Sequence, residues 1–269
     1  MKNKNDEVVY KERLTHLLRM ILEIGWNDVK EEKDIEIAYQ KRLKFQKITD
    51  WKKYRASIDL IDDTEYAIVS AFQYQLGDKR NENWDIGEIY LRLYGILNAV
   101  YLQISAFEVI ANLLNFPGRE EVPLSFHKLR IYQLRNIAAS HTVDYDYSAE
   151  FVRSKPDINK KTSFRITQSK LEKTGSKITA FDENNISFTF NLKEILTEYE
   201  SVARNLLVRL IQHSIKELVD KKEDKVEMRN RLEEMLPRLI DYSTIDENEK
   251  YFKAQLKRVI EMSKRKGSS

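Results

Sequence analysis

Apolar residues recur at intervals of three and four along most of the chain, a spacing typical of amphipathic helices. Residues 6–24 form the first such segment, and Gly25 is the expected end of that helix. Residues 29–48 carry many Lys and Glu side chains and predict a second, solvent-facing helix. Residues 86–115 have apolar side chains on most sides, which predicts a helix at the centre of a bundle.

The acidic run at residues 62–65 has the pattern of a helix start, in which Asp62 caps the first turn and Glu65 reaches back to it. A metal site is the alternative role for these carboxylates. We favour capping because no histidine and no further acidic cluster accompanies the run.

The central helix is expected to end at the turn-forming residues 115–118, and residues 124–140 predict a second buried helix. Over residues 162–191 the pattern changes to an alternation of apolar and polar residues that is rich in Thr, Ile and Phe and is interrupted by turn signals. This alternation predicts a small antiparallel meander inserted between helices. Helical spacing resumes over residues 192–220.

These elements predict a mainly α fold, a helical bundle with a small antiparallel β-meander insertion. We expect residues 1–80 to form an N-terminal helical extension packed on the bundle. The bundle itself is expected to cover residues 86–220, with the β insertion at about 162–191. Residues 221–269 are expected to add charged helices and a basic tail.

Composition narrows the class of protein without identifying a function. Of the 269 residues, 42% are hydrophobic and 33% are charged, as expected of a globular, helix-rich protein. The absence of cysteine excludes disulfides, cysteine-based zinc sites and thiol catalysis, and it suits the reducing cytoplasm in which we expect the protein. A net charge of +3 does not by itself indicate nucleic-acid binding.

We expect no segment that enters a membrane. The longest stretch without charge, Leu93–Phe107, has 15 residues and includes Asn98 and Gln103. A membrane span needs about 20 apolar residues, so this stretch predicts a buried core helix instead. The N-terminus also lacks the apolar region of a signal peptide.

The candidate chemistry lies in the segment LRNIAASHT, at the end of the second buried helix. Helical spacing puts His141 on one stripe with Leu134 and Ala138. His127, seven residues before Leu134, falls on the same stripe and is a candidate neighbour of the site. Arg135 precedes His141 by about 9 Å along a helix and about 120° around it. A two-fold axis beside this helix would bring two such pairs into one cleft.

This pair suits RNA cleavage without a metal. Histidine transfers protons near neutral pH, so His141 is the candidate acid and base. Arg135 stays charged and can hold a phosphate oxygen in the transition state, and Asn136 adds a neutral donor and acceptor beside it. RNA supplies its own nucleophile, the 2′-hydroxyl. By spacing alone, however, a histidine on an apolar stripe is more often a core residue than a catalyst.

Arg135, the polar Asn136, Ser140 and then His141 resemble the Arg-x(4–6)-His signature of HEPN-domain ribonucleases. The helices expected over residues 86–142 are similar to the central helix pair of bacterial HEPN proteins. This resemblance implies a homodimer whose two Arg–His pairs line a shared cleft. It also implies RNA cleavage by 2′-hydroxyl attack without metal or other cofactor, which leaves a 2′,3′-cyclic phosphate.

The resemblance further assigns roles to the residues. Arg135 would bind the scissile phosphate, His141 would act as acid and base, and Asn136 would orient the cluster. The biological role would be that of a toxin or abortive-infection effector in phage defence, controlled by an antitoxin or another regulatory protein. Members paired with a nucleotidyltransferase antitoxin often carry a tyrosine two positions after the histidine. Val143 stands there in this chain, which argues against control by tyrosine modification.

A basic segment follows the motif. Residues 153–177 hold eight Lys or Arg residues against two acidic ones. The candidate RNA-binding residues in this segment are Lys155, Lys160, Lys161 and Arg165. Protection of exposed edge strands from aggregation is the alternative role, and the sequence does not decide between the two.

The sequence therefore predicts a metal-independent endoribonuclease of HEPN type. The first alternative is a catalytically inactive HEPN scaffold that binds RNA or a protein partner. The second alternative is a plain helical dimerisation module. The pair of Arg135 and His141 separates the ribonuclease from both alternatives.

Overall fold

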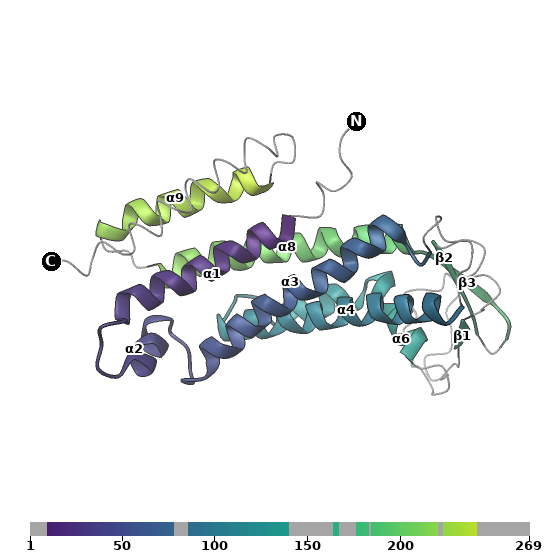
Figure 1. Ribbon diagram of the computed structural model, residues 1–269, viewed down its shortest axis with the longest axis horizontal. Helices are drawn as coiled ribbons and strands as arrows, with labels where there is room; N and C mark the ends of the chain where they lie inside the picture. The colour runs from purple at the N-terminus through teal and green to yellow at the C-terminus, as the bar shows by residue number, and fades with distance from the viewer. Residues whose placement is uncertain are drawn as a thin grey trace. The chain divides into compact units, whose positions relative to one another are not determined.

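The computed structural model describes residues 10–77, 86–139, 164–166, 176–182, 184–219 and 223–240. Its helices are α1 (Tyr10–Val29), α2 (Ile35–Arg42), α3 (Asp50–Tyr74), α4 (Ile86–Leu113), α5 (Glu121–His127), α6 (Arg130–Ala139), α8 (Leu192–Leu218) and α9 (Glu223–Ile240) (Figure 1). Its strands are β1 (Phe164–Ile166), β2 (Lys177–Asp182) and β3 (Ser187–Asn191). The prediction of a mainly α fold with a small antiparallel β insertion is confirmed.

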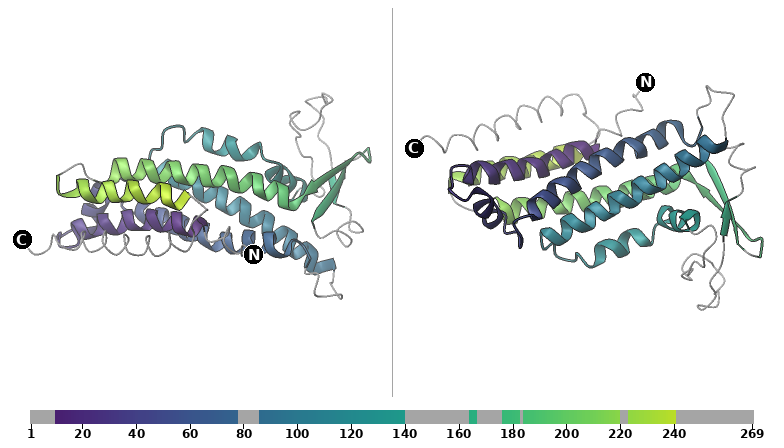
Figure 2. Two further views of the ribbon diagram at one scale, coloured as in Figure 1. Left: turned by 90° about the horizontal axis from the view of Figure 1, so that it is seen from above. Right: turned by 60° about the horizontal axis from the view of Figure 1, so that its bottom comes forward.

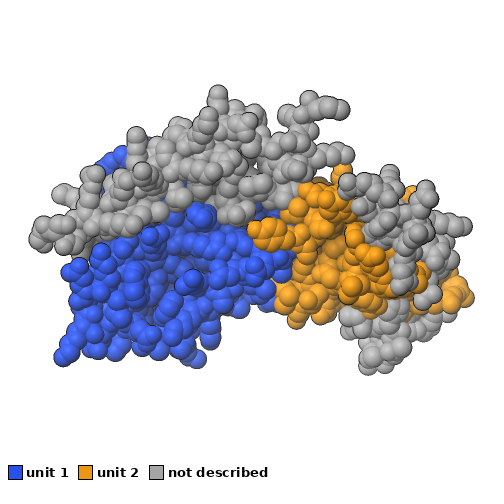
Figure 3. Space-filling view, viewed as in Figure 1, with its two compact units in different colours: residues 1–65, 105–122, 203–269 blue, residues 66–104, 123–202 orange. Residues whose placement is uncertain are grey.

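The chain folds into two compact units, which Figure 3 draws in separate colours. Unit 1 comprises residues 1–65, 105–122 and 203–269, and unit 2 comprises residues 66–104 and 123–202. Helices α3, α4, α5 and α8 each contribute residues to both units. The three sequence ranges expected above remain a prediction.

In unit 1, α1 packs against α2 and α9, and Figure 2 shows α9 running along α1. The helix does not end at Gly25, as expected from the sequence, but continues to Val29. Gly25 is a packing position instead, because a Cβ there would lie 2.9 Å from Leu43 Cδ2 and 3.2 Å from Tyr39 Cε2. A glycine inside a helix therefore marks a close helix contact here.

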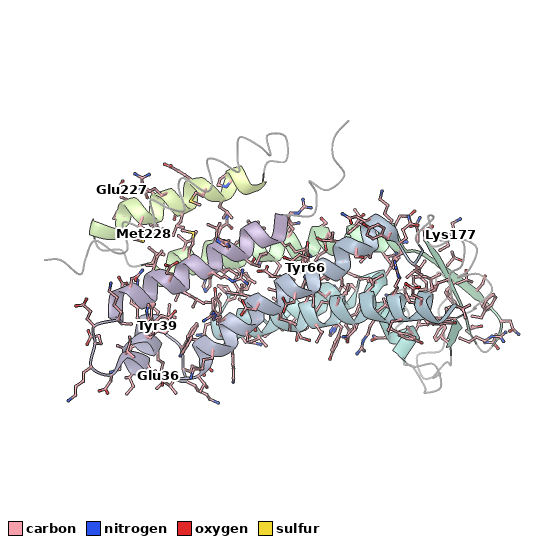
Figure 4. All side chains as sticks on the ribbon, in the orientation of Figure 1. Glu36, Tyr39, Tyr66, Lys177, Glu227 and Met228 are labelled. Carbon is pink, nitrogen blue, oxygen red and sulfur yellow. The ribbon has the colours of Figure 1, made fainter. Side chains whose placement is uncertain are left out.

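The helix expected over residues 29–48 is shorter than predicted; most of its residues face solvent, as expected, but Tyr39 does not. After α1 ends at Val29, only the eight residues of α2 are helical, and the backbone turns at Lys44, whose φ of 55° is left-handed. Tyr39 on α2, labelled in Figure 4, is buried, and its hydroxyl donates a 2.8 Å hydrogen bond to the Leu22 carbonyl. The rings of Trp26 and Trp51 lie edge-on to it. One anchored aromatic side chain thus holds this charged segment in place.

The helix start expected at residues 62–65 is also wrong. α3 begins at Asp50, and the acidic run lies in the middle of the helix. Asp62 forms an ion pair with Arg19, and Glu65 lies 2.7 Å from Lys11, both partners being on α1. The carboxylates are therefore used for contact between two helices and not for capping their own.

The helix expected over residues 124–140 consists of two helices, α5 and α6, which are interrupted after His127. Phe126 and Ile131 are both fully buried. In a continuous helix, side chains five residues apart point about 140° apart. The interruption lets both side chains face the core of unit 2.

The predicted meander is confirmed as a three-stranded antiparallel sheet in the order β1-β2-β3. Ile178 and Ala180 on the buried side pair with Phe190 and Phe188 of β3. The Asp182 carboxylate shapes the following turn by accepting hydrogen bonds from the backbone N–H groups of residues 184 and 186. β1 contacts α6, so the sheet lies beside the helix that carries Arg135 and Asn136.

By length and composition alone, α4 could also cross a membrane, and core helices of soluble proteins pass the same test. Its most apolar window is 56% buried inside the protein. The expectation that no segment enters a membrane stays a prediction.

Candidate functional site

Arg135 and Asn136 are positioned by the orientation of α6 in unit 2. Leu134, Ile137 and Ala138 are buried, and they fix the side of the helix that faces the core. This burial confirms the predicted stripe of Leu134 and Ala138. Arg135 and Asn136 lie away from that stripe and are half-buried, so their polar groups stay within reach of solvent.

Two neutral groups hold the guanidinium of Arg135. Its Cζ lies 4.1 Å from the ring centroid of Tyr101 on α4, and its Nη1 donates a 3.0 Å hydrogen bond to Asn136 Oδ1. Among the residues that the structure describes, no carboxylate forms an ion pair with Arg135. Stacking and hydrogen bonding therefore fix the plane of the group, while no carboxylate of the described residues compensates its positive charge.

Arg130, at the start of the same helix, shows the contrasting arrangement. Its guanidinium forms two hydrogen bonds with the carboxylate of Glu198, and Glu194 lies 3.9 Å away. The hydrogen bond to Glu198 raises the pKa of Arg130 above its usual value. Arg130 is thus a structural cation that ties α6 to α8 within unit 2.

An open cavity of about 510 Å³ lies beside Arg130. Its charged lining comprises Arg130, Lys193, Glu194 and Glu198, so positive and negative groups balance. Arg135 is not part of this lining. The cavity therefore lacks the excess positive charge that a phosphate chain requires.

The other predicted site residues are only partly described. His141, Lys155, Lys160 and Lys161 lie outside the described residues, and their roles stay predictions. Arg165 on β1 is exposed, and it donates a 2.7 Å hydrogen bond to Asn185 Oδ1. Its guanidinium also lies 5.8 Å from the ring centroid of Phe181, its cross-strand neighbour.

His127 does not occupy the predicted stripe. It ends α5, so no continuous helix relates it to Leu134, and its side chain is exposed. Its imidazole stacks on the ring of Tyr132, with centroids 4.3 Å apart and planes inclined by 28°. Tyr132 precedes Arg135 by three residues on α6, a spacing that could have drawn attention to it in the sequence.

A second arginine and histidine lie close together in unit 1. Arg209 lies over the ring of Phe116 at 5.1 Å, and His213 lies edge-on to the same ring. The Nε2 atom of His213 is 3.0 Å from the carbonyl oxygen of Leu114. Because this imidazole is tied to the backbone, the pair has a structural role and provides a control for Arg135.

The described part of the chain contains no group of three or more His, Asp or Glu side chains that could hold a metal ion. Comparison of the chain with family models, with curated proteins and with solved structures gave no match. The resemblance to HEPN ribonucleases therefore stays a prediction from the sequence motif.

Proposed function

We propose that this protein is a metal-independent endoribonuclease of the HEPN type that acts as a homodimer. The observation that carries the proposal is the state of Arg135, a fixed guanidinium whose charge no described carboxylate compensates. Such a group binds phosphate oxygens through two parallel hydrogen bonds. In contrast, Arg19 and Arg130 are occupied by carboxylates.

In the proposed reaction, Arg135 holds the non-bridging oxygens of the scissile phosphate, and Asn136 keeps the guanidinium oriented. His141 removes the proton of the ribose 2′-hydroxyl. The 2′-oxygen then forms a bond to phosphorus while the bond from phosphorus to the 5′-oxygen breaks. The second copy of His141 donates a proton to the leaving oxygen, and the product carries a 2′,3′-cyclic phosphate.

The proposed homodimer is supported by an exposed, uncharged face of α4 in unit 2. Leu91, Tyr94 and Asn98 are exposed, and with Tyr101 they follow a spacing of three, four and three residues. Leu91 is 73% exposed. A second copy is the occupant we propose, because a symmetric contact places like surface on like and an uncharged face avoids repulsion. The contact would start beside Tyr101 and thus beside Arg135.

Light scattering at micromolar concentration tests the homodimer, and we expect the mass of two chains. Leu91→Glu should give monomers and should abolish cleavage. Ile186→Glu changes another exposed apolar residue of unit 2, outside the α4 face, and should leave the dimer intact. A stable monomer of the unmodified chain would contradict the shared cleft.

The cleavage proposal is tested with purified protein and a mixed RNA pool in EDTA. We expect cutting with cyclic phosphate ends, and a loss of about 100-fold or more for Arg135→Ala and for His141→Ala. Arg209→Ala removes a guanidinium from a similar aromatic stack and should cut normally. A requirement for added Mg²⁺, or cutting that persists in both site variants, excludes this mechanism.

The toxin or defence role is tested in a bacterial host. Induced expression of the unmodified chain should arrest growth, whereas His141→Ala should not. Mapping the RNA ends in arrested cells then identifies the substrate. Equal growth of both strains would remove the toxin role.

A scaffold that binds RNA without cutting it is the second candidate, and the exposed side of the sheet favours it. Arg165 and Phe181 are paired across β1 and β2, and Lys177, labelled in Figure 4, lies on the same side of β2. Cations next to an aromatic ring suit a nucleic-acid chain. RNA binding that is lost in a Lys160→Ala, Lys161→Ala, Arg165→Ala variant, without any cleavage by the unmodified chain, would favour the scaffold.

A further inference from the structure

The stacked pair of His127 and Tyr132 lies one helical turn from Arg135. Residues three apart on a helix have Cβ atoms about 5–6 Å apart, so the side chains of Tyr132 and Arg135 leave α6 from neighbouring positions. His127 extends this aromatic surface outwards, because its exposed imidazole covers Tyr132 at 4.3 Å. A cation and an aromatic stack thus start from neighbouring positions of α6 in unit 2.

The stack is not required to hold α5 and α6 together. Phe126, next to His127, is fully buried and packs against Tyr199, with ring centroids 5.7 Å apart. Ile131, next to Tyr132, is also fully buried. The turn between the helices is closed by a 3.0 Å hydrogen bond from the Leu129 N–H to the Phe126 carbonyl. Core packing and the backbone therefore fix the turn, and the exposed imidazole is available for another partner.

We propose that His127 and Tyr132 form a stacking platform for one unpaired base of the RNA whose phosphate Arg135 holds. This inference rests on the proposed function and adds a base-binding position beside the proposed phosphate-binding residue. Every base has a π-face that stacks on an aromatic side chain, whatever its sequence. A base inside a duplex is already stacked and paired, so a platform of this kind selects loops, ends and single strands.

Binding is measured separately from cleavage. The protein carries His141→Ala to prevent cutting, and the probe is a short single-stranded RNA with one 2-aminopurine, whose fluorescence is quenched by stacking. We expect His127→Ala to weaken binding about 5- to 150-fold and to remove the quenching. His127→Phe keeps an aromatic face and should retain both the affinity and the quenching. His127→Gln keeps only a polar side chain and should lose both.

Two controls accompany these variants. His16→Ala removes an exposed histidine of α1 and should bind RNA normally. The same RNA annealed to its complement should be insensitive to His127→Ala. Thermal unfolding of each variant verifies that the fold is kept.

The outcomes separate this inference from the proposed function. Unchanged affinity of His127→Ala, equal loss in His127→Phe, or equal loss with duplex RNA would each overturn the platform. If quenching depends on His127 while Arg135→Ala still cuts RNA, the stacking platform is supported and the proposed cleavage mechanism is excluded. If Arg135 and His141 are required for cutting but quenching is independent of His127, only the platform falls. Absence of any RNA binding overturns both.

Discussion

The ammonium group of Lys11 lies 2.7 Å from the Glu65 carboxylate, and the two side chains are only 2% and 10% exposed. This ion pair joins α1 to α3 inside unit 1. Removing one partner from a buried pair leaves an uncompensated charge, which costs far more than the pair itself contributes.

We therefore expect Lys11→Met to lower the free energy of unfolding by about 3–5 kcal/mol. The double variant Lys11→Met, Glu65→Leu should recover most of that loss, because no isolated charge remains. The exposed pair of Lys44 and Glu217, 3.5 Å apart, is the control, and Lys44→Met should change stability by less than about 1 kcal/mol. Urea denaturation measures all of these values. Equal effects at both pairs would show that burial is not the decisive difference.

Substitution by alanine should have opposite effects on stability at Gly25 and at Gly95. The Cβ added by Gly25→Ala would meet Leu43 Cδ2 at 2.9 Å, so we expect a destabilisation of about 1–3 kcal/mol. Gly95 lies exposed on α4 with no atom within 4 Å of an added Cβ. Gly95→Ala should therefore stabilise the protein by about 0.5–1 kcal/mol. Chemical denaturation of both variants measures the sign of each change in the free energy of unfolding. A stabilised Gly25→Ala variant would disprove the close contact.

Orientation of the guanidinium should matter as much as its charge at position 135. Arg135→Lys keeps the charge but loses the planar group that stacks on Tyr101, and we expect cleavage about 100-fold slower in single-turnover assays. Tyr101 acts as a positioning residue. Tyr101→Phe keeps the aromatic face and should retain activity, whereas Tyr101→Ala should lose it. Full activity of Arg135→Lys would show that charge alone suffices.

Alkaline pH should weaken the fold through two buried tyrosines. Burial raises the pKa of Tyr39 and of Tyr54 well above the usual value of 10. Near pH 10 the unfolded chain ionises these hydroxyls while the folded protein does not. Their contribution to stability is therefore complete below pH 10 and declines as the pH rises towards the raised values.

Urea denaturation at pH 8 and pH 11 measures this decline. Tyr54→Phe should make the free energy of unfolding less dependent on pH, because it removes one of the ionising groups. Tyr66→Phe is the control, since Tyr66, which is labelled in Figure 4, is 68% exposed, and this variant should behave like the unmodified chain. An unaltered pH dependence in Tyr54→Phe would exclude the burial effect.

The sequence predicted the elements whose signals are local. The apolar pattern of residues 86–115 and of residues 192–220 corresponds closely to α4 and α8, and the alternation over residues 162–191 corresponds to the sheet. Periodicity identifies such elements because each buries one continuous face. The motif placed Arg135 and Asn136 side by side, since neighbours in sequence are neighbours in the structure.

Only the tertiary structure decided which partner each polar side chain takes. The carboxylates of Asp62 and Glu65 fit a helix start by sequence, yet the cations of α1 bind them in the middle of α3. Likewise, Arg130 is neutralised by Glu198, whereas the guanidinium of Arg135 rests on Tyr101. Charged and aromatic side chains that are far apart in sequence come into contact only when the helices pack. The residue spacing that predicts a helix therefore does not predict these pairings.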